Sequence, residues 1–239
     1  MQQRKKTIFL ALVATVMALN LFIAGLFTVA LGEAKARKEA EVRTTVENLA
    51  LLLDQSVSSS VRGIDQSLRE IQLQLERTLR QQVPLTDPDT VALLAFHESW
   101  LSQIAELRVS DAQGRVLLGH GVTSDTRVSY ADRDYFRAHR EQDDGQTRAS
   151  KLLYGRIAGT WITVFSRRYN HPDGRFAGMV TAAVPVQHFE AMLSGLRLGR
   201  HGIALMRDTD KALIARAPRL DAPAGRVGVR AGSQELTNI

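Results

Sequence analysis

An uncharged apolar segment near the N-terminus constrains this chain more than any other feature. Residues 7–31 read TIFLALVATVMALNLFIAGLFTVAL, in which only Thr7, Thr15, Asn20 and Thr28 are polar. As a helix, this segment would span roughly 37 Å, which exceeds a hydrocarbon core of about 30 Å. The segment therefore predicts a transmembrane helix. A cleaved signal peptide is the competing interpretation, although its apolar core usually covers only about 7–15 residues.

The charges on the two sides of this segment predict its orientation. Arg4, Lys5 and Lys6 precede it, whereas residues 33–43 mix four bases with three acids. Because basic residues favour the cytoplasmic side of a membrane, we expect residues 1–6 to form a cytoplasmic tail and residues 32–239 to lie outside. Membrane lipid is then a partner of the chain.

The composition excludes several classes of function. The chain has no cysteine, which excludes disulfides, thiol catalysis and cysteine metal sites. Its formal net charge of +6 could indicate a nucleic-acid partner. However, the bases are mostly arginines scattered among acids, and no run of five or six bases occurs outside the membrane anchor. We therefore expect no nucleic-acid partner.

A long helix is predicted after the anchor, over residues 32–83. Apolar side chains recur there at steps of three or four: Val42, Val46, Leu49, Leu53, Val57, Val61, Ile64, Leu68, Ile71, Leu75 and Leu79. The mean step of about 3.7 exceeds the 3.5 of a two-stranded coiled coil, so the helix should pack mainly on its own domain. Residues 56–60, SVSSS, and Gly63 weaken the helix propensity midway. Pro84 should end the helix by Val83.

The rest of the chain mixes short helices with segments of period two. Asp87 and Pro88 predict the start of a helix over 88–101. The pattern predicts strands at 104–109, 115–118, 148–154, 160–168 and 176–184, and helices at 131–141 and 185–193. From Gly202 it restarts, because 202–206 and 212–215 repeat the hairpin pattern of 104–118. Residues 217–239 show little periodicity, and the chain is expected to be incomplete there.

Three stretches of the sequence resemble the double Cache family, also called PDC sensor domains. They are YADRDYFRAHRE, GRIAGTWITVFSRRYNHPDGRFAGMVTAAVPVQHFEAML and GIALMRDTDKALIAR. The sequence is most similar to sensors that precede diguanylate cyclase or histidine kinase modules in bacterial membrane proteins, over roughly residues 36–216. The resemblance implies an α+β fold: a transmembrane helix, a long stalk helix, a PAS-like antiparallel-sheet Cache domain at 84–195, distal to the membrane, and the truncated start of a second, membrane-proximal one at 196–239. It also implies a homodimer in the bacterial inner (plasma) membrane, with its sensory part periplasmic.

The resemblance also implies a ligand site. Amino-acid-binding members carry an arginine, any residue and then Trp-Tyr, and the arginine helps to hold the ligand carboxylate. Residues 133–136, Arg-Asp-Tyr-Phe, fit that spacing. Two departures matter: a tyrosine expected upstream is Val128, and the family's aspartate for the ligand amino group is Arg156. They argue against an amino-acid ligand and leave open a ligand with a carboxylate and no ammonium group.

The residue types suit such a ligand. A guanidinium can hold a carboxylate through two parallel hydrogen bonds, and aromatic rings beside it exclude water. The candidate ligand-binding residues are Arg133, Asp134, Tyr135, Phe136, Tyr154, Arg156, Trp161 and Arg167. Asp132 and Asp134 could orient Arg133 or neutralise it.

A plainer interpretation exists for most of these residues. The aromatic side chains could be core residues, and Arg133 could form an ordinary surface ion pair of under about 1 kcal/mol. Neighbouring strand residues face opposite sides of a sheet, so only one of Arg167 and Arg168 can face a pocket, and we favour Arg167.

No catalytic arrangement is evident in the sequence. The six histidines lack metal-ligand spacing, no glycine-rich loop follows a strand, and no serine lies in a nucleophile elbow. We therefore expect no catalytic residue, metal or cofactor in this chain. An extracytoplasmic hydrolase is accordingly disfavoured.

Two hypotheses of function remain. In the first, the chain is the sensory region of a receptor that relays a small anionic ligand to a missing cytoplasmic module, a diguanylate cyclase or a histidine kinase. Any enzymatic activity would belong to that module. In the second, it is a membrane-anchored protein-interaction module whose pocket is filled by its own side chains, Phe136 and Trp161 among them.

Overall fold

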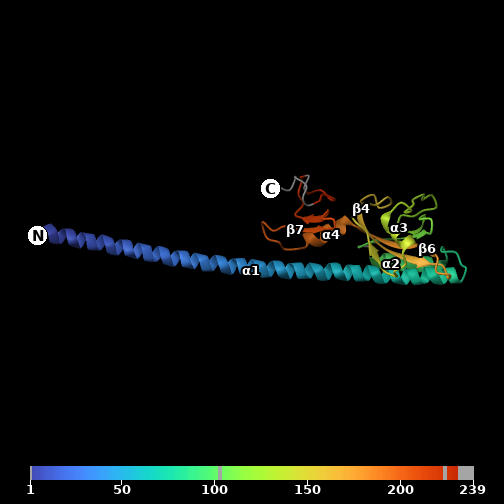
Figure 1. Cartoon of the computed structure of the whole chain (residues 1–239), viewed down its shortest axis with the longest axis horizontal. Helices are drawn as coiled ribbons and strands as arrows, with labels where there is room; N and C mark the ends of the chain where they lie inside the picture. Colours follow the sequence, from blue (N-terminus) through green and yellow to red (C-terminus); the bar gives the residue numbers. More distant parts are fainter. Residues whose placement is uncertain (1, 102–103, 223–224, 231–239) are drawn as a thin grey trace. The chain divides into compact units, whose positions relative to one another are not determined.

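The computed structural model describes residues 2–101, 104–222 and 225–230, with side chains described for residue 17 and from residue 19 onward within these ranges. The chain forms two compact units, Met1–Asp54 and Gln55–Ile239. Helix α1 (Gln2–Arg80) supplies all of the described first unit and continues into the second (Figure 1). It is unbroken through residues 56–63 despite their weak helix propensity, and it ends before Val83, as Pro84 predicts.

The first unit consists of helix alone, and its described side chains are largely exposed. Within the residues that the structure describes, α1 is the one helix long and apolar enough to cross a membrane, a test that a signal sequence would also meet. Ion pairs one helical turn apart, such as Arg37–Glu33 and Arg43–Glu47, follow the anchor segment. They are exposed, so each stabilises the helix only slightly.

The second unit contains an antiparallel sheet with helices on both faces. Its elements are α2 (Pro88–Leu101), β1 (Glu106–Asp111), β2 (Val116–Gly119), α3 (Asp134–Glu141), β3 (Arg148–Ala149), β4 (Leu153–Tyr154), β5 (Trp161–Asn170), β6 (Phe176–Pro185) and α4 (Val186–Ser194). The strand order is β2-β1-β6-β5-β3, and β4 also pairs with β5. Strands β7 (Ala204–Arg207) and β8 (Leu213–Ala217) form a separate hairpin. The predicted α+β class is therefore confirmed.

One face of the sheet packs against α1 and α2. The core there contains these buried side chains: Ile64, Leu68, Ile71 and Leu75 of α1, Leu94 and Leu101 of α2, and Leu107, Val109, Tyr169, Val180, Ala182 and Val184 of the sheet. The C-terminal part of the apolar stripe seen in the sequence is thus the packing surface of α1. Asp87 caps α2 as predicted, because its carboxylate accepts hydrogen bonds from the backbone N–H groups of Asp89 and Thr90.

The opposite face of the sheet carries α3 and the loops around it. Apolar side chains there include Phe136, Ile162, Val164 and Met179. Polar side chains of the same face, Arg108 and Thr181 among them, are also buried. This face holds the candidate site.

Candidate functional site

Arg133 lies immediately before α3, in an extended backbone conformation that turns the chain into the helix. Its Nη2 donates a hydrogen bond to the carbonyl oxygen of Tyr154 at 3.0 Å. Its Nε is buried and has no hydrogen-bond partner among the described residues. Since a buried charged donor without a partner is costly, this atom is a plausible contact for an external acceptor.

The aspartates beside Arg133 do not orient it, which corrects one expectation from the sequence. Asp132 pairs with Arg156, and Asp134 pairs with Arg137 one turn along α3. Both carboxylates are satisfied by other arginines, so neither holds the guanidinium of Arg133 in place or neutralises it by direct contact.

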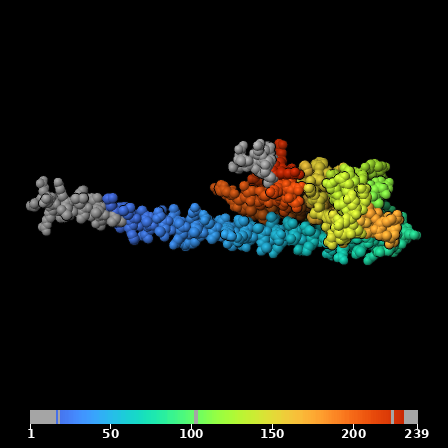
Figure 2. Space-filling view, in the orientation of Figure 1, coloured from blue at the N-terminus to red at the C-terminus, as the bar shows by residue number. Residues whose placement is uncertain are grey.

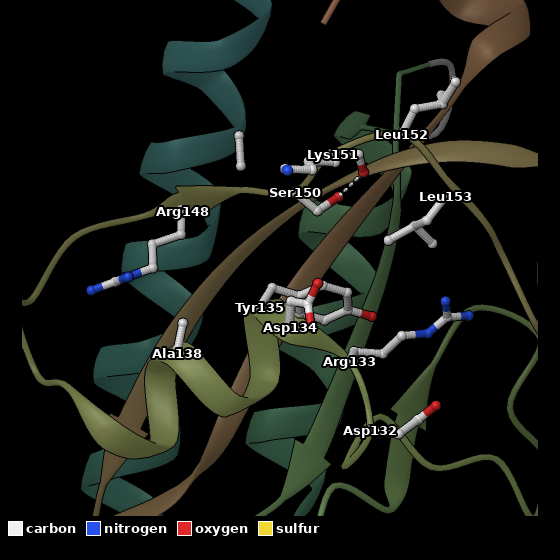
Figure 3. A pocket seen from close by; sticks show the side chains of 11 residues that line it. Asp132, Arg133, Asp134, Tyr135, Ala138, Arg148, Ser150, Lys151, Leu152 and Leu153 are labelled. Carbon is white, nitrogen blue, oxygen red and sulfur yellow. Dashed lines mark hydrogen bonds between the residues drawn. The ribbon is translucent and has the colours of Figure 1, made fainter. Parts of the chain in front are cut away.

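A groove of about 700 Å³ opens beside Arg133. Its lining residues come from two segments: Asp132, Arg133, Asp134, Tyr135 and Ala138 around the start of α3, and Arg148, Ala149, Ser150, Lys151, Leu152 and Leu153 from β3 to β4. Figure 3 shows these two segments on opposite sides of the groove. The volume is within the range of small-molecule sites.

A much smaller inner cleft lies between this region and the sheet. It holds about 10 Å³ and is lined by Arg108, Tyr130, Arg133, Tyr135 and Arg156, among others. That volume is close to the minimum for one water molecule. The inner cleft therefore cannot hold an organic ligand unless its walls move.

The inner cleft is rich in cations and phenols. Arg108 is only 2% exposed and pairs with Glu106 at 2.6 Å, while its Nε donates to the carbonyl oxygen of His120. Burial raises the pKa of both Tyr130 and Tyr135, so both phenols are neutral at physiological pH. These side chains present hydrogen-bond donors, which suits an anion better than a cation.

A bidentate ion pair between Asp132 and Arg156, here called the clasp, lies between the groove and the inner cleft. The Nη1–Oδ1 and Nη2–Oδ2 distances are 2.8 and 2.6 Å, and Nη1 also donates to the carbonyl oxygen of Ser129. The hydrogen bonds from Arg156 lower the pKa of Asp132 to about 2. Because Asp132 lines the groove and Arg156 lines the cleft, the clasp joins the segment before α3 to the loop after β4.

The structure brings four of the eight predicted residues to this region and places the others elsewhere. Arg133, Asp134 and Tyr135 line the groove, and Arg156 lines the inner cleft. Tyr154 contributes its carbonyl oxygen, whereas its ring is exposed and lies against Trp161.

Phe136, Trp161 and Arg167 are not part of the groove. Phe136 is fully buried against Phe176, as expected for a core residue. Trp161 lines a separate depression of about 480 Å³ near α4. Arg167 faces α1, where it bonds to the side chain of Gln72, because odd-numbered residues of β5 from 165 to 169 point to that side of the sheet.

Sequence reasoning missed several residues that line the groove or the cleft. Lys151 lies on a stretch predicted as one strand, and nothing in its spacing distinguishes it. The position of Arg108 could have been predicted from strand alternation. It lies between Leu107 and Val109 in a predicted strand, so its side chain faces the side of the sheet opposite to theirs. Within the described residues, no cluster of three or more histidine, aspartate or glutamate side chains could hold a metal ion.

Comparison with known proteins gives structural neighbours only, since no protein-family model and no curated protein matches the sequence. The extracellular domain of the putative histidine kinase rpHK1S-Z16 has 26% identity and a TM-score of 0.66, with 84% of this chain and 77% of that chain covered. The ligand-binding domain of the Campylobacter jejuni chemoreceptor Tlp3, in complex with L-valine, has 11% identity and a TM-score of 0.56, covering 75% and 72%.

A third neighbour is the ligand-binding domain of the Pseudomonas aeruginosa PAO1 amino acid chemoreceptor PctC in complex with GABA. It has 13% identity and a TM-score of 0.54, with 72% of this chain and 75% of that chain covered. Two of the three are ligand-binding domains of chemoreceptors, and one is the extracellular domain of a putative histidine kinase. The described chain therefore has the fold of the Cache-type extracellular sensor domains of histidine kinases and chemoreceptors, as its sequence predicted.

Proposed function

We propose that this chain is the sensory region of a bacterial membrane receptor that binds a small carboxylate lacking an ammonium group. The observation that carries the proposal is the guanidinium of Arg133, which lines the groove and has a buried Nε without a partner among the described residues. A ligand carboxylate would satisfy that donor once the side chains that cover it move aside. A planar guanidinium is also the side chain best suited to bidentate recognition of a carboxylate.

The absence of an ammonium group follows from the charges around the groove. An amino-acid ligand needs an anionic partner for its amino group, and both aspartates that line the groove already pair with arginines. The resemblance to the double Cache family also implies that Arg156 stands where its amino-acid-binding members carry an aspartate. The ligand class would thus differ from the L-valine and GABA of two structural neighbours.

A physical connection from α3 to α1 supports a relay of the bound state. The segment after α3 reaches α1 through Thr147, whose hydroxyl bonds to the carboxylate of Asp65. Arg167 adds bonds to Gln72 of α1 and to the carbonyl oxygen of Gly145. A ligand that favours one arrangement of α3 could therefore bias α1, provided that its affinity differs between the arrangements.

The layout predicted from the sequence completes the proposal. Residues 1–6 would be cytoplasmic, 7–31 would cross the inner membrane, and 32–83 would form the stalk of a homodimer. Residues 84–195 would be the membrane-distal Cache domain, with the start of a proximal one at 196–239, of which 231–239 lie outside the described residues. The likeness to the rpHK1S-Z16 domain favours a histidine kinase as the output over a diguanylate cyclase.

Thermal unfolding of the full 239-residue chain in lipid nanodiscs tests the carboxylate site. A ligand at 100 times its dissociation constant should stabilise the folded state by about 2.7 kcal/mol. We expect at least one acid of a panel of small carboxylates to raise the melting temperature. Arg133→Gln should abolish the rise, whereas Arg140→Gln, at an exposed position of α3 outside the groove lining, should keep it. A panel without effect, or a rise that survives Arg133→Gln, would refute the site.

One observation favours the alternative of a protein-interaction module. The enclosed space beside Arg133 is about 10 Å³, and Phe136 fills the core next to it. In addition, Phe96 and Trp100 of α2 are 65% and 61% exposed. If the carboxylate panel has no effect, a photo-crosslinker at position 96 that captures one specific partner in bacterial membranes would support this alternative.

A further inference from the structure

Lys151 connects the groove to the hairpin of β7 and β8. Its side chain is exposed on the groove side opposite α3 (Figure 3). Its Nζ lies 2.7 Å from Oδ2 of Asp210, in the turn between β7 and β8. Figure 2 shows yellow surface of the main sheet region beside the orange-red surface of the hairpin. This contact is between two segments that are far apart in the sequence.

Lys151 is the closer of the two basic side chains that pair with the carboxylate of Asp210. Arg230 approaches the same Oδ2 only to 3.9 Å. The hydrogen bond between the two raises the pKa of Lys151 and lowers that of Asp210, so both are charged at physiological pH. A further carboxylate, that of Asp134, also lies on the groove lining and favours the charged lysine.

From this arrangement we infer that Lys151 is a switchable ligand contact, which exchanges Asp210 for an anionic group of the bound ligand and thereby releases the turn between β7 and β8 from the groove. The inference rests on the proposed carboxylate site and extends it. Arg133 would hold one anionic group of the ligand, and Lys151 would hold a second group across the groove. The ligand class is therefore a small molecule with two anionic ends.

The energetics allow this exchange. The side chain of Lys151 is 68% exposed and that of Asp210 is 32% exposed, so the bond between them is a weak surface ion pair. A second anion in the groove would compete with Asp210 on nearly equal terms. Because competition is reciprocal, removing Asp210 should strengthen the binding of a doubly charged ligand by about two- to fivefold.

Succinate and butyrate are matched probes, because each has four carbons and only succinate has a second carboxylate. We would measure both affinities by calorimetry on the full chain in nanodiscs. Asp210→Asn should strengthen succinate binding by about two- to fivefold and leave butyrate binding unchanged. Lys151→Met should weaken succinate binding, and in that background Asp210→Asn should have no further effect.

Glu190→Gln is the control variant, because it breaks another ion pair of the C-terminal segment, with Arg219, away from the groove. It should leave both affinities unchanged. Hydrogen exchange of the turn between β7 and β8 supplies a structural readout: succinate, but not butyrate, should accelerate exchange in residues 208–211 of the wild-type chain.

The outcomes separate the inference from the function on which it rests. If neither acid binds the wild-type chain, both the carboxylate site and the switch are wrong. If succinate binds but Asp210→Asn does not strengthen it, or if the gain persists with Lys151→Met, the switch alone is wrong. Succinate binding without faster exchange in this turn would also overturn the release step.

Discussion

The face of the main sheet that packs on α1 and α2 buries mostly aliphatic side chains, whereas the opposite face buries arginine, tyrosine and histidine beside its apolar residues. Burial of aliphatic groups is favourable without any particular partner. Burial of Arg108 or His139 is tolerated only while hydrogen bonds or opposite charges compensate for lost water. One face thus supplies stability that depends little on conditions, and the other supplies stability that a ligand or a proton can change.

The largest loss of stability should come from a substitution in the aliphatic face, the name used here for the face of the main sheet that packs on α1 and α2. The opposite face is called the polar face. Leu68→Ala removes a fully buried side chain of α1 and should lower the free energy of unfolding by about 3–5 kcal/mol, through lost burial and a residual cavity. Leu73→Ala, on the same helix but 41% exposed, should have little effect. Denaturant unfolding of both variants measures the difference, and equal losses would mean that α1 does not form the core described above.

On the polar face, Glu106→Ala should lower the free energy of unfolding by about 2–3 kcal/mol, somewhat less than Leu68→Ala. It leaves the buried guanidinium of Arg108 without its carboxylate, although the bond to the carbonyl oxygen of His120 remains. The double variant with Arg108→Met should recover much of the loss, because no unpaired charge is left. A double variant as unstable as Glu106→Ala alone would show that packing, and not charge, sets the cost.

Acid should weaken the polar face through His139. This side chain is fully buried, its Nε2 contacts the carbonyl oxygen of Ser166, and burial lowers its pKa below 6.5. The unfolded chain therefore binds the proton first, and stability should fall as the pH drops below 6.5, by up to about 1.4 kcal/mol per pH unit. Unfolding of His139→Gln between pH 7.5 and 5.5 should show a flatter profile than the wild type. His201→Gln, at an exposed position, should keep the wild-type profile.

The smallest effect is expected for the clasp. Asp132 has a pKa lowered to about 2, so the clasp contributes stability above pH 3.8 that is lost as the pH falls towards 2. The carboxylate is 63% exposed, which limits the contribution to under about 1 kcal/mol. Asp132→Asn should therefore be slightly less stable than the wild type at pH 7, and the difference should shrink as the pH falls from 3.8 towards 2. A difference that stays constant over this range would have another cause than charge.

The sequence predicted the aliphatic face better than the polar one. The spacing of Ile64, Leu68, Ile71 and Leu75 predicted the packing side of α1, because burial of apolar side chains follows helical periodicity. The cap of α2 was also predicted, and so were most strands, with boundaries displaced by at most two residues. The predicted strand at 148–154 is instead two pairs of residues, β3 and β4, separated by an irregular segment.

The site was less predictable because its charged side chains form ion pairs with residues that are distant in the sequence. Arg133 was identified from its spacing, yet the partner of Asp132 is Arg156, 24 residues away. Lys151 and Asp210 are further apart still, and no local pattern links them. Arg167 was assigned to the pocket although strand alternation leaves the choice between Arg167 and Arg168 open, and the structure turns Arg168 towards α3 instead.

Strand β6 has a practical consequence for handling this protein. Its residues 177–184 are all buried, and the segment FAGMVTAAVP contains no charge. Such a segment aggregates readily when its neighbours no longer cover it, because its backbone can pair with copies of itself. The short edge strands β2 and β3 offer little for such pairing, so the folded sheet is protected. Truncated versions that delete β1 or β5 should therefore accumulate as insoluble material, whereas those that keep residues 55–194 together avoid this hazard.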